Sequence, residues 1–348
     1  MTASATIVPA RTTRAGPHRD RLDAALDRLG GIAPAISARA RTSLRAALGG
    51  LAASRLGEAA WTCSRLTPTG YPVELGVTSR RAELRWVSEV IAPEDDPAKA
   101  VHRAEAIAVA HGAIALDRGL RDAIRDGQDG QALRFGAWLG ARHGERDGDV
   151  RDTWKLYAEV PRETGWQGLP FDLGPARDIL GGIATPRFVG LGLDGTGRTE
   201  LYARVLPGAE DAVAVAFGRS HLAAFVHPLL SRLAAFGARR PAPHNLGLSL
   251  VIGPEHEVMA LSVFTFARQL FPTDRDARSH LLRTAHEEGW PSAALYDALT
   301  APLQSPFAVP GALVHGPISL VTHADGSSET HIGLAPPRTP PRQGGDDA

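Results

Sequence analysis

The chain has 348 residues, of which 43% are hydrophobic and 22% are charged, so it can bury a large core. Its 38 basic and 38 acidic residues cancel, which argues against a protein held on nucleic acid or on an anionic membrane by its overall field. Any anion-binding site must therefore be local. The single cysteine, Cys63, excludes an intramolecular disulfide and fits a reducing compartment.

The ends of the chain carry little that could order them. The first 16 residues lack a continuous apolar stretch, and no later run is long enough to span a bilayer, so we expect a cytoplasmic protein. From Pro336 onward the sequence is rich in proline and glycine and cannot bury apolar area against the entropy of ordering. We predict a disordered N-terminal tail over 1–17, a single domain over 18–335 and a disordered C-terminal tail over 336–348.

Short segments with alternating apolar and polar side chains predict strands, and these segments come in five pairs. The turns within the pairs have suitable residues, as in Asp194-Gly195-Thr196-Gly197 and Asp325-Gly326. The pairs start at intervals of roughly sixty residues, a spacing typical of internal structural repeats. The expected strands span residues 71–79 and 83–91, 133–142 and 152–161, 187–194 and 198–206, 245–252 and 257–266, and 314–323 and 328–335.

Helical patterns lie between the pairs, over residues 36–56, 97–125, 209–236 and 274–303, with a short one at 175–180. Ten antiparallel strands with helices in the connections can form an open sheet or a closed ring. We favour closure, because it removes exposed strand edges. The expected fold class is α+β, a ten-stranded antiparallel β-barrel with helices outside, wide enough to leave a cavity.

Charged residues interrupt the strands at positions that closure would turn inward. On the first strand Val73, Leu75 and Val77 form an apolar face, which leaves Glu74 on the other face. Arginine, lysine and tyrosine donors that converge in a cavity would bind a multiply charged anion such as a diphosphate. The alternative is that each charge lies on a solvated strand face. The set comprises Glu74, Arg85, Glu89, Lys155, Arg198 and Glu200, with Tyr157 and Tyr202.

Three short motifs on successive hairpins carry a resemblance to a known family. Pro72-Val73-Glu74, followed by Leu84-Arg85 and Glu89, resembles the first hairpin of the aromatic prenyltransferases of the dimethylallyltryptophan synthase type. Lys155-Leu156-Tyr157 is similar to that family's Lys-x-Tyr strand, and the segment 198–202 is similar to its Arg-x-Lys-x-Tyr strand. The resemblance runs from about residue 20 to 336 and implies a barrel of five αββα repeats, the PT barrel.

The resemblance implies an enzyme that ionises an allylic diphosphate, such as dimethylallyl diphosphate, so that an aromatic ring attacks the carbocation. Lys155, Arg85 and Arg198 would hold the diphosphate, while Tyr157 and Tyr202 would donate hydrogen bonds and screen the cation. Glu74 would accept the N–H of an indole-like acceptor. The acceptor would be a small molecule or an aromatic residue of a peptide, the chemistry would need no metal and no cofactor, and the protein would be a monomer or homodimer.

The chain departs from the family pattern at several positions. Glu200 replaces the lysine between Arg198 and Tyr202 and would weaken diphosphate binding unless it pairs with Arg198. The fourth hairpin has Val258–Ser262 where the family has polar and tyrosine ligands, and the fifth has His331 where it has tyrosine. These departures favour a second hypothesis, a barrel that binds a small hydrophobic or anionic ligand, or a partner protein, without turnover.

Other patterns carry no assignment. Glu94-Asp95-Asp96 directly precedes Pro97, which is typical of a solvated first turn of a helix rather than of a magnesium site. The histidines lack the spacing of metal ligands, and we predict no metal. The glycines at 190–197 lie on a strand and in a turn without a following helix, so they do not predict a dinucleotide site.

Overall fold

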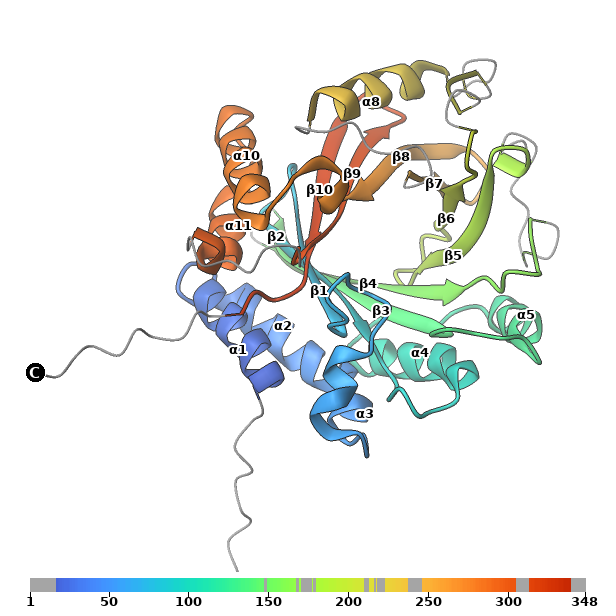
Figure 1. The fold of residues 1–348 in the computed structure, drawn as a ribbon. Coiled ribbons are helices and arrows are strands. Elements are labelled where there is room, and N and C mark those ends of the chain that lie inside the picture. The colour runs from blue at the N-terminus through green and yellow to red at the C-terminus, as the bar shows by residue number, and fades with distance from the viewer. Residues whose placement is uncertain are drawn as a thin grey trace, which may run out of the picture.

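The ten predicted strands are present and form a closed antiparallel barrel (Figure 1). The structure is a computed structural model and describes residues 17–146, 149–166, 169, 177, 180–209, 213–215, 217, 223–236, 246–304 and 313–338. The strands are β1 (Val73–Thr78), β2 (Glu83–Glu89), β3 (Ala137–Arg146), β4 (Asp149–Glu159), β5 (Ala184–Gly192), β6 (Thr199–Val205), β7 (Gly247–Ile252), β8 (Val258–Phe266), β9 (His315–His323) and β10 (Ser328–Leu334).

Strand β1 closes the ring by pairing with both β2 and β10. Leu75 lies opposite Trp86 on one side and opposite Leu334 on the other. Apart from this β1–β10 pairing, every pair joins strands that are consecutive in the sequence, so each hairpin is a local unit. The prediction of a closed ten-stranded barrel with helices outside is confirmed, because no strand is left with an unpaired edge.

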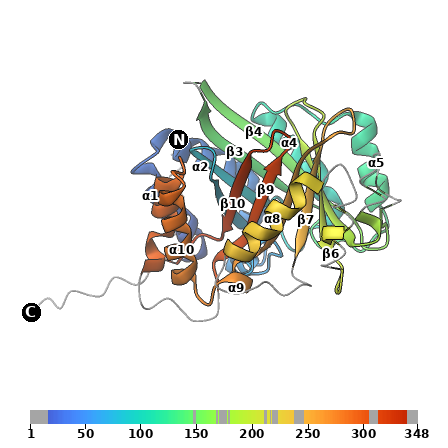
Figure 2. The same ribbon diagram turned by 90° about the horizontal axis from the view of Figure 1, so that it is seen from above.

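Helices cover the outside of the barrel. Helix α2 packs on β2 and β3, α4 on β3 and β4, and α8 on β8 and β9. Figure 2 shows α1 and α10 on one side of the barrel and α5 on the opposite side. The helices are α1 (Pro17–Gly30), α2 (Pro34–Ala47), α3 (Gly49–Ala52), α4 (Ala100–Ala110), α5 (Arg118–Gln128), α8 (Ala223–Phe236), α9 (Ala267–Leu270), α10 (Asp274–Glu287) and α11 (Ala293–Thr300), with 3-10 turns at Gly57–Thr62, Pro97–Lys99 and Ala301–Gln304.

Three of the predicted helices are each divided. The pattern over 36–56 becomes α2 and α3, which are separated by Leu48, and the other two divide at a glycine. The pattern over 97–125 becomes α4 and α5, and the one over 274–303 becomes α10 and α11. A glycine with positive φ stands at each of these two later breaks, Gly112 at 87° and Gly289 at 64°, a conformation that ends a helix and that other residues rarely adopt. Helix α1 was not predicted, and most of the short pattern at 175–180 lies outside the described residues.

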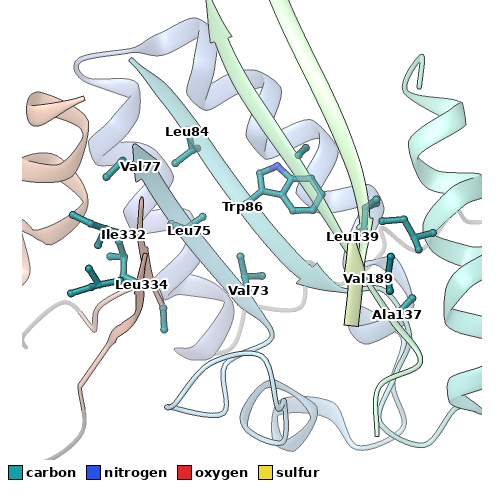
Figure 3. Close-up of a cluster of buried hydrophobic side chains, with 14 of the residues drawn as sticks. Val73, Leu75, Val77, Leu84, Trp86, Ala137, Leu139, Val189, Ile332 and Leu334 are labelled. Atoms are coloured by element: carbon teal, nitrogen blue, oxygen red, sulfur yellow. The ribbon is translucent and has the colours of Figure 1, made fainter. Parts of the chain in front are cut away.

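The main hydrophobic core lies between the barrel and its helices rather than inside the barrel. In Figure 3 Leu75, Leu84 and Trp86 are part of this layer together with Ile332 and Leu334, and all five are at most 1% exposed. Full burial of each such side chain contributes about 1.5–3 kcal/mol. Because side chains alternate along a strand, the outward position of Leu75 turns Glu74 and Gly76 toward the interior.

A buried polar cluster fixes α2 to the barrel. The indole Nε1 of Trp86 donates to Nε2 of His143 at 3.0 Å, and Nδ1 of His143 lies 2.9 Å from Asp152. Ser43 on α2 lies 2.9 Å from the same Nε2. The serine, histidine and aspartate stand in the order of a nucleophilic triad, but Ser43 and His143 are 2% and 1% exposed, so a substrate has no access and the cluster is structural.

The two ends of the described chain meet beside α1. Arg21 donates two hydrogen bonds, of 3.1 and 2.7 Å, to the carbonyl oxygen of Pro336, and Pro336 and Pro337 are buried. The packed region therefore includes these two residues of the predicted tail, and Pro17 begins α1; residues 1–16 and 339–348 lie outside the described residues. Within the described ranges no helix is both long and apolar enough to cross a membrane.

Candidate functional site

The barrel encloses a cavity of about 300 Å³, and all ten strands contribute to its wall. The cavity exists because the inward positions hold small or polar side chains among the aromatic ones, such as Gly76, Ser249, Ala260, Ser262 and Ser319. A volume of this size lies at the lower end of the range for small-molecule sites. The expectation that the barrel has a hollow centre is confirmed.

Four of the predicted site residues line this cavity: Glu74, Arg85, Tyr157 and Tyr202. Lys155 reaches the same group, since its Nζ lies 3.3 Å from the hydroxyl of Tyr202. The structure does not place Arg198 with them. Arg198 stands one residue before β6 in the turn after β5, and it is exposed.

Lys155 and Glu200 form an ion pair inside the barrel. The ammonium donates to Oε2 of Glu200, and Oε1 accepts a hydrogen bond of 2.6 Å from Ser249. Burial alone would raise the pKa of Glu200, but the Lys155 charge and these hydrogen bonds lower it to about 2. Glu200 is therefore ionised at neutral pH. Lys155, rather than Arg198, is therefore the cation that pairs with Glu200.

A glycine on the intervening strand makes room for this pair. Lys155 is on β4 and Glu200 on β6, and Gly190 on β5 lies between them, opposite both Tyr157 and Glu200 in register. A Cβ atom at Gly190 would overlap Cε of Lys155 and lie 3.2 Å from the ring of Tyr202. The absence of a side chain in mid-strand therefore allows the lysine to cross β5.

Aromatic rings surround the lysine. Its Nζ lies 5.3 Å from the ring centre of Tyr157 and 5.4 Å from that of Tyr202, within the range of cation–π contacts. Phe188 stacks on Tyr202 at 4.4 Å, and Trp138 meets Phe188 edge to face at 5.6 Å. The sequence analysis missed Trp138, Phe188 and Phe264, although strand alternation places them on inward faces.

Glu74 stands on the opposite part of the ring, on β1. Burial raises its pKa to about 8, although the nearby Arg85 charge acts in the other direction. Two glycines leave space around the carboxyl group, because a Cβ at Gly333 would lie 2.5 Å from its Cδ and one at Gly316 would lie 2.9 Å from Oε2. Glu74 is thus a carboxyl group near its midpoint of ionisation, facing the cavity.

Arg85 contacts a histidine network on β9 and β10. Its Nη1 lies 2.7 Å from Nδ1 of His331. The carboxylate of Glu329 lies between two imidazoles, 3.1 Å from Nε2 of His331 and 3.2 Å from Nε2 of His323. Burial opposes the charge of Glu329, but His331, His323 and Arg85 hold its pKa well below the ordinary value. From the sequence, no role was expected for Glu329, His323 or His331.

The guanidinium group of Arg85 also remains positively charged. Burial favours the neutral guanidine, but the side chains of Tyr157, Tyr202, Glu83 and Glu329 outweigh it and raise its pKa further above the ordinary value. Arg85 therefore presents a permanent cation to the cavity. Glu89, which the sequence analysis included among the strand charges, instead ends β2 and accepts a 2.7 Å hydrogen bond from Ser64 outside the residues that line the cavity.

The arrangement provides fixed donors, aromatic faces and a titratable carboxyl group around one hollow. Arg85 and Lys155 can stabilise an anion, the rings of Tyr157, Tyr202 and Phe188 can face a carbocation, and Glu74 can accept a proton or an N–H. Among the described residues no three histidine, cysteine, aspartate or glutamate side chains are grouped as metal ligands.

No protein-family model matches the chain, and no curated protein matches it. Solved structures do match. The 5-dimethylallyltryptophan synthase of Streptomyces coelicolor superimposes with a TM-score of 0.71 at 17% identity, covering 94% of this chain and 99% of that one. This chain has the fold of the dimethylallyltryptophan synthases.

Two further structures with this fold match over a similar length. The 6-dimethylallyltryptophan synthase of Micromonospora olivasterospora, in complex with DMASPP and Trp, has a TM-score of 0.71 at 21% identity and covers 93% of this chain and 99% of that one. The prenyltransferase PriB in its apo form has a TM-score of 0.69 at 18% identity, covering 94% and 98%. The PT-barrel architecture predicted from the hairpin motifs is thereby confirmed across nearly the whole chain.

Proposed function

We propose that the protein is an aromatic prenyltransferase, which transfers an allylic prenyl group from a diphosphate donor to an indole-like acceptor inside the barrel. The observation that carries this proposal is the convergence of Glu74, Arg85, Lys155, Tyr157 and Tyr202 around one cavity in a dimethylallyltryptophan synthase fold. Solved proteins with this fold are named as complexes with DMASPP and Trp, or with product diphosphate, which supports the same donor and acceptor classes here.

In the proposed reaction the C–O bond of the donor breaks and its electron pair leaves with the diphosphate. Arg85 and Lys155 stabilise the anion as it forms. The faces of Tyr157, Tyr202 and Phe188 stabilise the allylic cation and exclude water. A carbon of the aromatic acceptor attacks the cation, and the ring then loses its proton.

Glu74 is proposed to hold the acceptor. A carboxyl group with a pKa of about 8 is populated in both protonation states near neutral pH, so it can accept an indole N–H and can also take up a proton. Its place on β1 puts it five strands from β6 in the closed order, so acceptor and diphosphate would enter from different parts of the wall. The acceptor is proposed to be a free small molecule, with an aromatic residue of a peptide as the alternative.

We also keep Arg198 as a proposed diphosphate ligand. Its exposed position before β6 would let it act only at the edge of the cavity, so its contribution should be smaller than that of Arg85. The protein is proposed to work in the cytoplasm as a monomer or homodimer.

A second candidate function is ligand binding without turnover. The Lys155–Glu200 pair favours it, because the carboxylate neutralises one of the cations that an ionising diphosphate needs. The aromatic wall and Arg85 remain suited to a small hydrophobic or singly charged ligand.

The test is calorimetric titration with dimethylallyl and geranyl diphosphates, followed by incubation with tryptophan or indole and mass spectrometry. The chain offers a matched pair of variants, since Lys155 and Lys99 are its two lysines and Lys99 is exposed on the surface. We expect Lys155→Ala to weaken donor binding at least tenfold and Lys99→Ala to leave it unchanged. Tight binding without prenylated product would favour the second candidate, and the absence of binding by any prenyl diphosphate would refute the first.

A further inference from the structure

The three cations expected from the sequence to bind the diphosphate differ in their present partners and in their exposure. Lys155 is paired with Glu200, and Arg198 is exposed outside the cavity. Arg85 lines the cavity, and in the part of the chain that the structure describes its contact is with an imidazole rather than a carboxylate. Arg65 and Arg142 also line the cavity, but Arg65 is exposed and Arg142 lies 3.6 Å from the carboxylate of Glu83. Because an allylic diphosphate carries several negative charges, a further donor beside Arg85 would add to the stabilisation of the leaving group.

We propose that His331 is a ligand of the leaving diphosphate and takes up a proton from solvent when that anion binds beside Arg85. This inference rests on the proposed function and adds a residue, and a proton, to its diphosphate site.

The contacts of His331 indicate how its hydrogen-bond partner would change when the anion binds. The lone pair of Nδ1 faces Nη1 of Arg85 at 2.7 Å, so the imidazole serves as an acceptor for the guanidinium. A diphosphate oxygen is a far stronger acceptor than a neutral nitrogen and would take that N–H. The freed lone pair then faces the anion and gains a proton, and the resulting N–H donates to a phosphoryl oxygen.

Glu329 prepares His331 for this protonation. Its carboxylate lies 3.1 Å from Nε2 of His331, on the side of the ring away from Arg85, and stabilises the imidazolium ion. Without the anion, burial and the Arg85 charge keep the pKa of His331 below its ordinary value, so the ring is neutral at pH 7. The negative charge of a bound anion would offset the repulsion from Arg85 and so favour the protonated form of His331.

The groups around His331 come from all the neighbouring elements. On β2 and β3 Arg85 and Arg142 oppose its protonation, and on β10 Glu329 favours it. On β9 His323 shares the Glu329 carboxylate, and its cross-strand neighbours Thr78 and Ser319 carry no charge. Glu74 on β1 lines the same cavity and is protonated below about pH 8. Two arginines oppose the protonation of His331 and one carboxylate favours it. The negative charge of a bound anion would therefore shift this balance toward the protonated ring.

Inorganic pyrophosphate is the probe for this inference. Calorimetric titration of the full chain at pH 7.0 in two buffers of different ionisation enthalpy measures the protons taken up on binding. We expect the wild type to take up between half a proton and one proton more than His331→Gln, because glutamine keeps a hydrogen-bonding side chain but cannot titrate. We expect the same substitution to weaken binding about 10- to 100-fold at pH 6.5, and by less at pH 8.5.

An exposed histidine outside the barrel supplies the control. His102→Gln changes a side chain on α4 and should retain the wild-type proton uptake to within a quarter of a proton. Comparison of variants under identical conditions cancels the titration of pyrophosphate itself.

The outcomes separate this inference from the proposed function. Equal proton uptake and equal affinity in wild type and His331→Gln would overturn the role of His331, while donor binding that depends on Lys155 and Arg85 would keep the prenyltransferase proposal. If the wild type binds neither pyrophosphate nor a prenyl diphosphate, both are overturned. Should His331→Gln fail to fold, His331→Asn takes its place in the same comparison, and proton uptake equal to that of the wild type contradicts the inference.

Discussion

The ammonium group of Lys155 binds the carboxylate of Glu200 across an intervening strand, in space that Gly190 leaves open. The pair joins β4 to β6 and lies against the rings of Tyr157 and Tyr202. It has two consequences. It holds Lys155 in one place, and it lowers the positive charge that the barrel offers to a diphosphate.

Removal of the Glu200 charge should therefore strengthen diphosphate binding. We expect Glu200→Gln to lower the dissociation constant of dimethylallyl diphosphate about tenfold and Glu200→Lys to lower it further, because each step frees or adds a donor facing the anion. Isothermal titration measures both. Glu255→Lys, which adds the same charge at an exposed position in the β7–β8 turn, is the control and should change the affinity less than twofold. Equal effects of the two lysine substitutions would contradict a local role for Glu200.

Gly190 should tolerate no side chain. A methyl group there overlaps the stem of Lys155, so Gly190→Ala should displace the ammonium from Glu200 and Tyr202 and destabilise the barrel by about 1–3 kcal/mol. The measurements are urea denaturation and donor affinity. Gly182→Ala is a matched control, because a Cβ at that position meets nothing within 4 Å. A Gly190→Ala variant with unchanged stability and affinity would show that Lys155 readily moves elsewhere.

The two arginines proposed to bind the diphosphate, Arg85 and Arg198, should contribute unequally to its affinity. Arg85 lies in the cavity wall and Arg198 is exposed, so Arg85→Ala should weaken diphosphate binding at least a hundredfold and Arg198→Ala less than about fivefold. Titration with pyrophosphate at two salt concentrations checks this, because an exposed contact is also the more sensitive to screening. A large loss for Arg198→Ala would mean that the β5–β6 turn folds inward when the anion binds.

The barrel could be predicted from the sequence because each hairpin is specified by residues that lie close together in the chain. Each hairpin has its own alternation and its own turn, and closure follows from pairing neighbours and removing edges. The inward placement of Glu74, Arg85, Tyr157 and Tyr202 follows from the same period of two. Arg198 could not be placed in this way, since alternation does not define where a strand begins, and Arg198 falls one residue before β6.

Pairings between strands that are not neighbours could not be predicted. The partner of Glu200 depends on the register of β4, β5 and β6 together and on the lack of a side chain at Gly190. The same holds for the contact of Arg85 with His331, which spans β1 and joins residues 246 positions apart. Trp138 and Phe188 were missed for another reason, because an aromatic residue on a strand is as suited to a core as to a cavity wall.

The stability of the barrel should depend on pH through Glu74. Its pKa is raised to about 8 in the folded state from 4.5, so between these values the folded protein holds a proton that the unfolded chain has lost. The free energy of unfolding should therefore fall as the pH rises, by about 1.4 kcal/mol per pH unit from this group. Glu89, with a pKa of about 7, acts in the same direction, while His331, with a lowered pKa, acts in the opposite one.

Comparison of wild type with Glu74→Gln isolates the contribution of Glu74. Urea denaturation at intervals from pH 5 to pH 9 should give a steeper decline for the wild type up to about pH 8 and parallel curves above it, where Glu74 is ionised in both states. Glu163→Gln, at an exposed position, should follow the wild-type curve. If wild type and Glu74→Gln decline with the same slope, Glu74 is already ionised across this range, and the raised pKa that would make it an effective base for the acceptor's proton is contradicted.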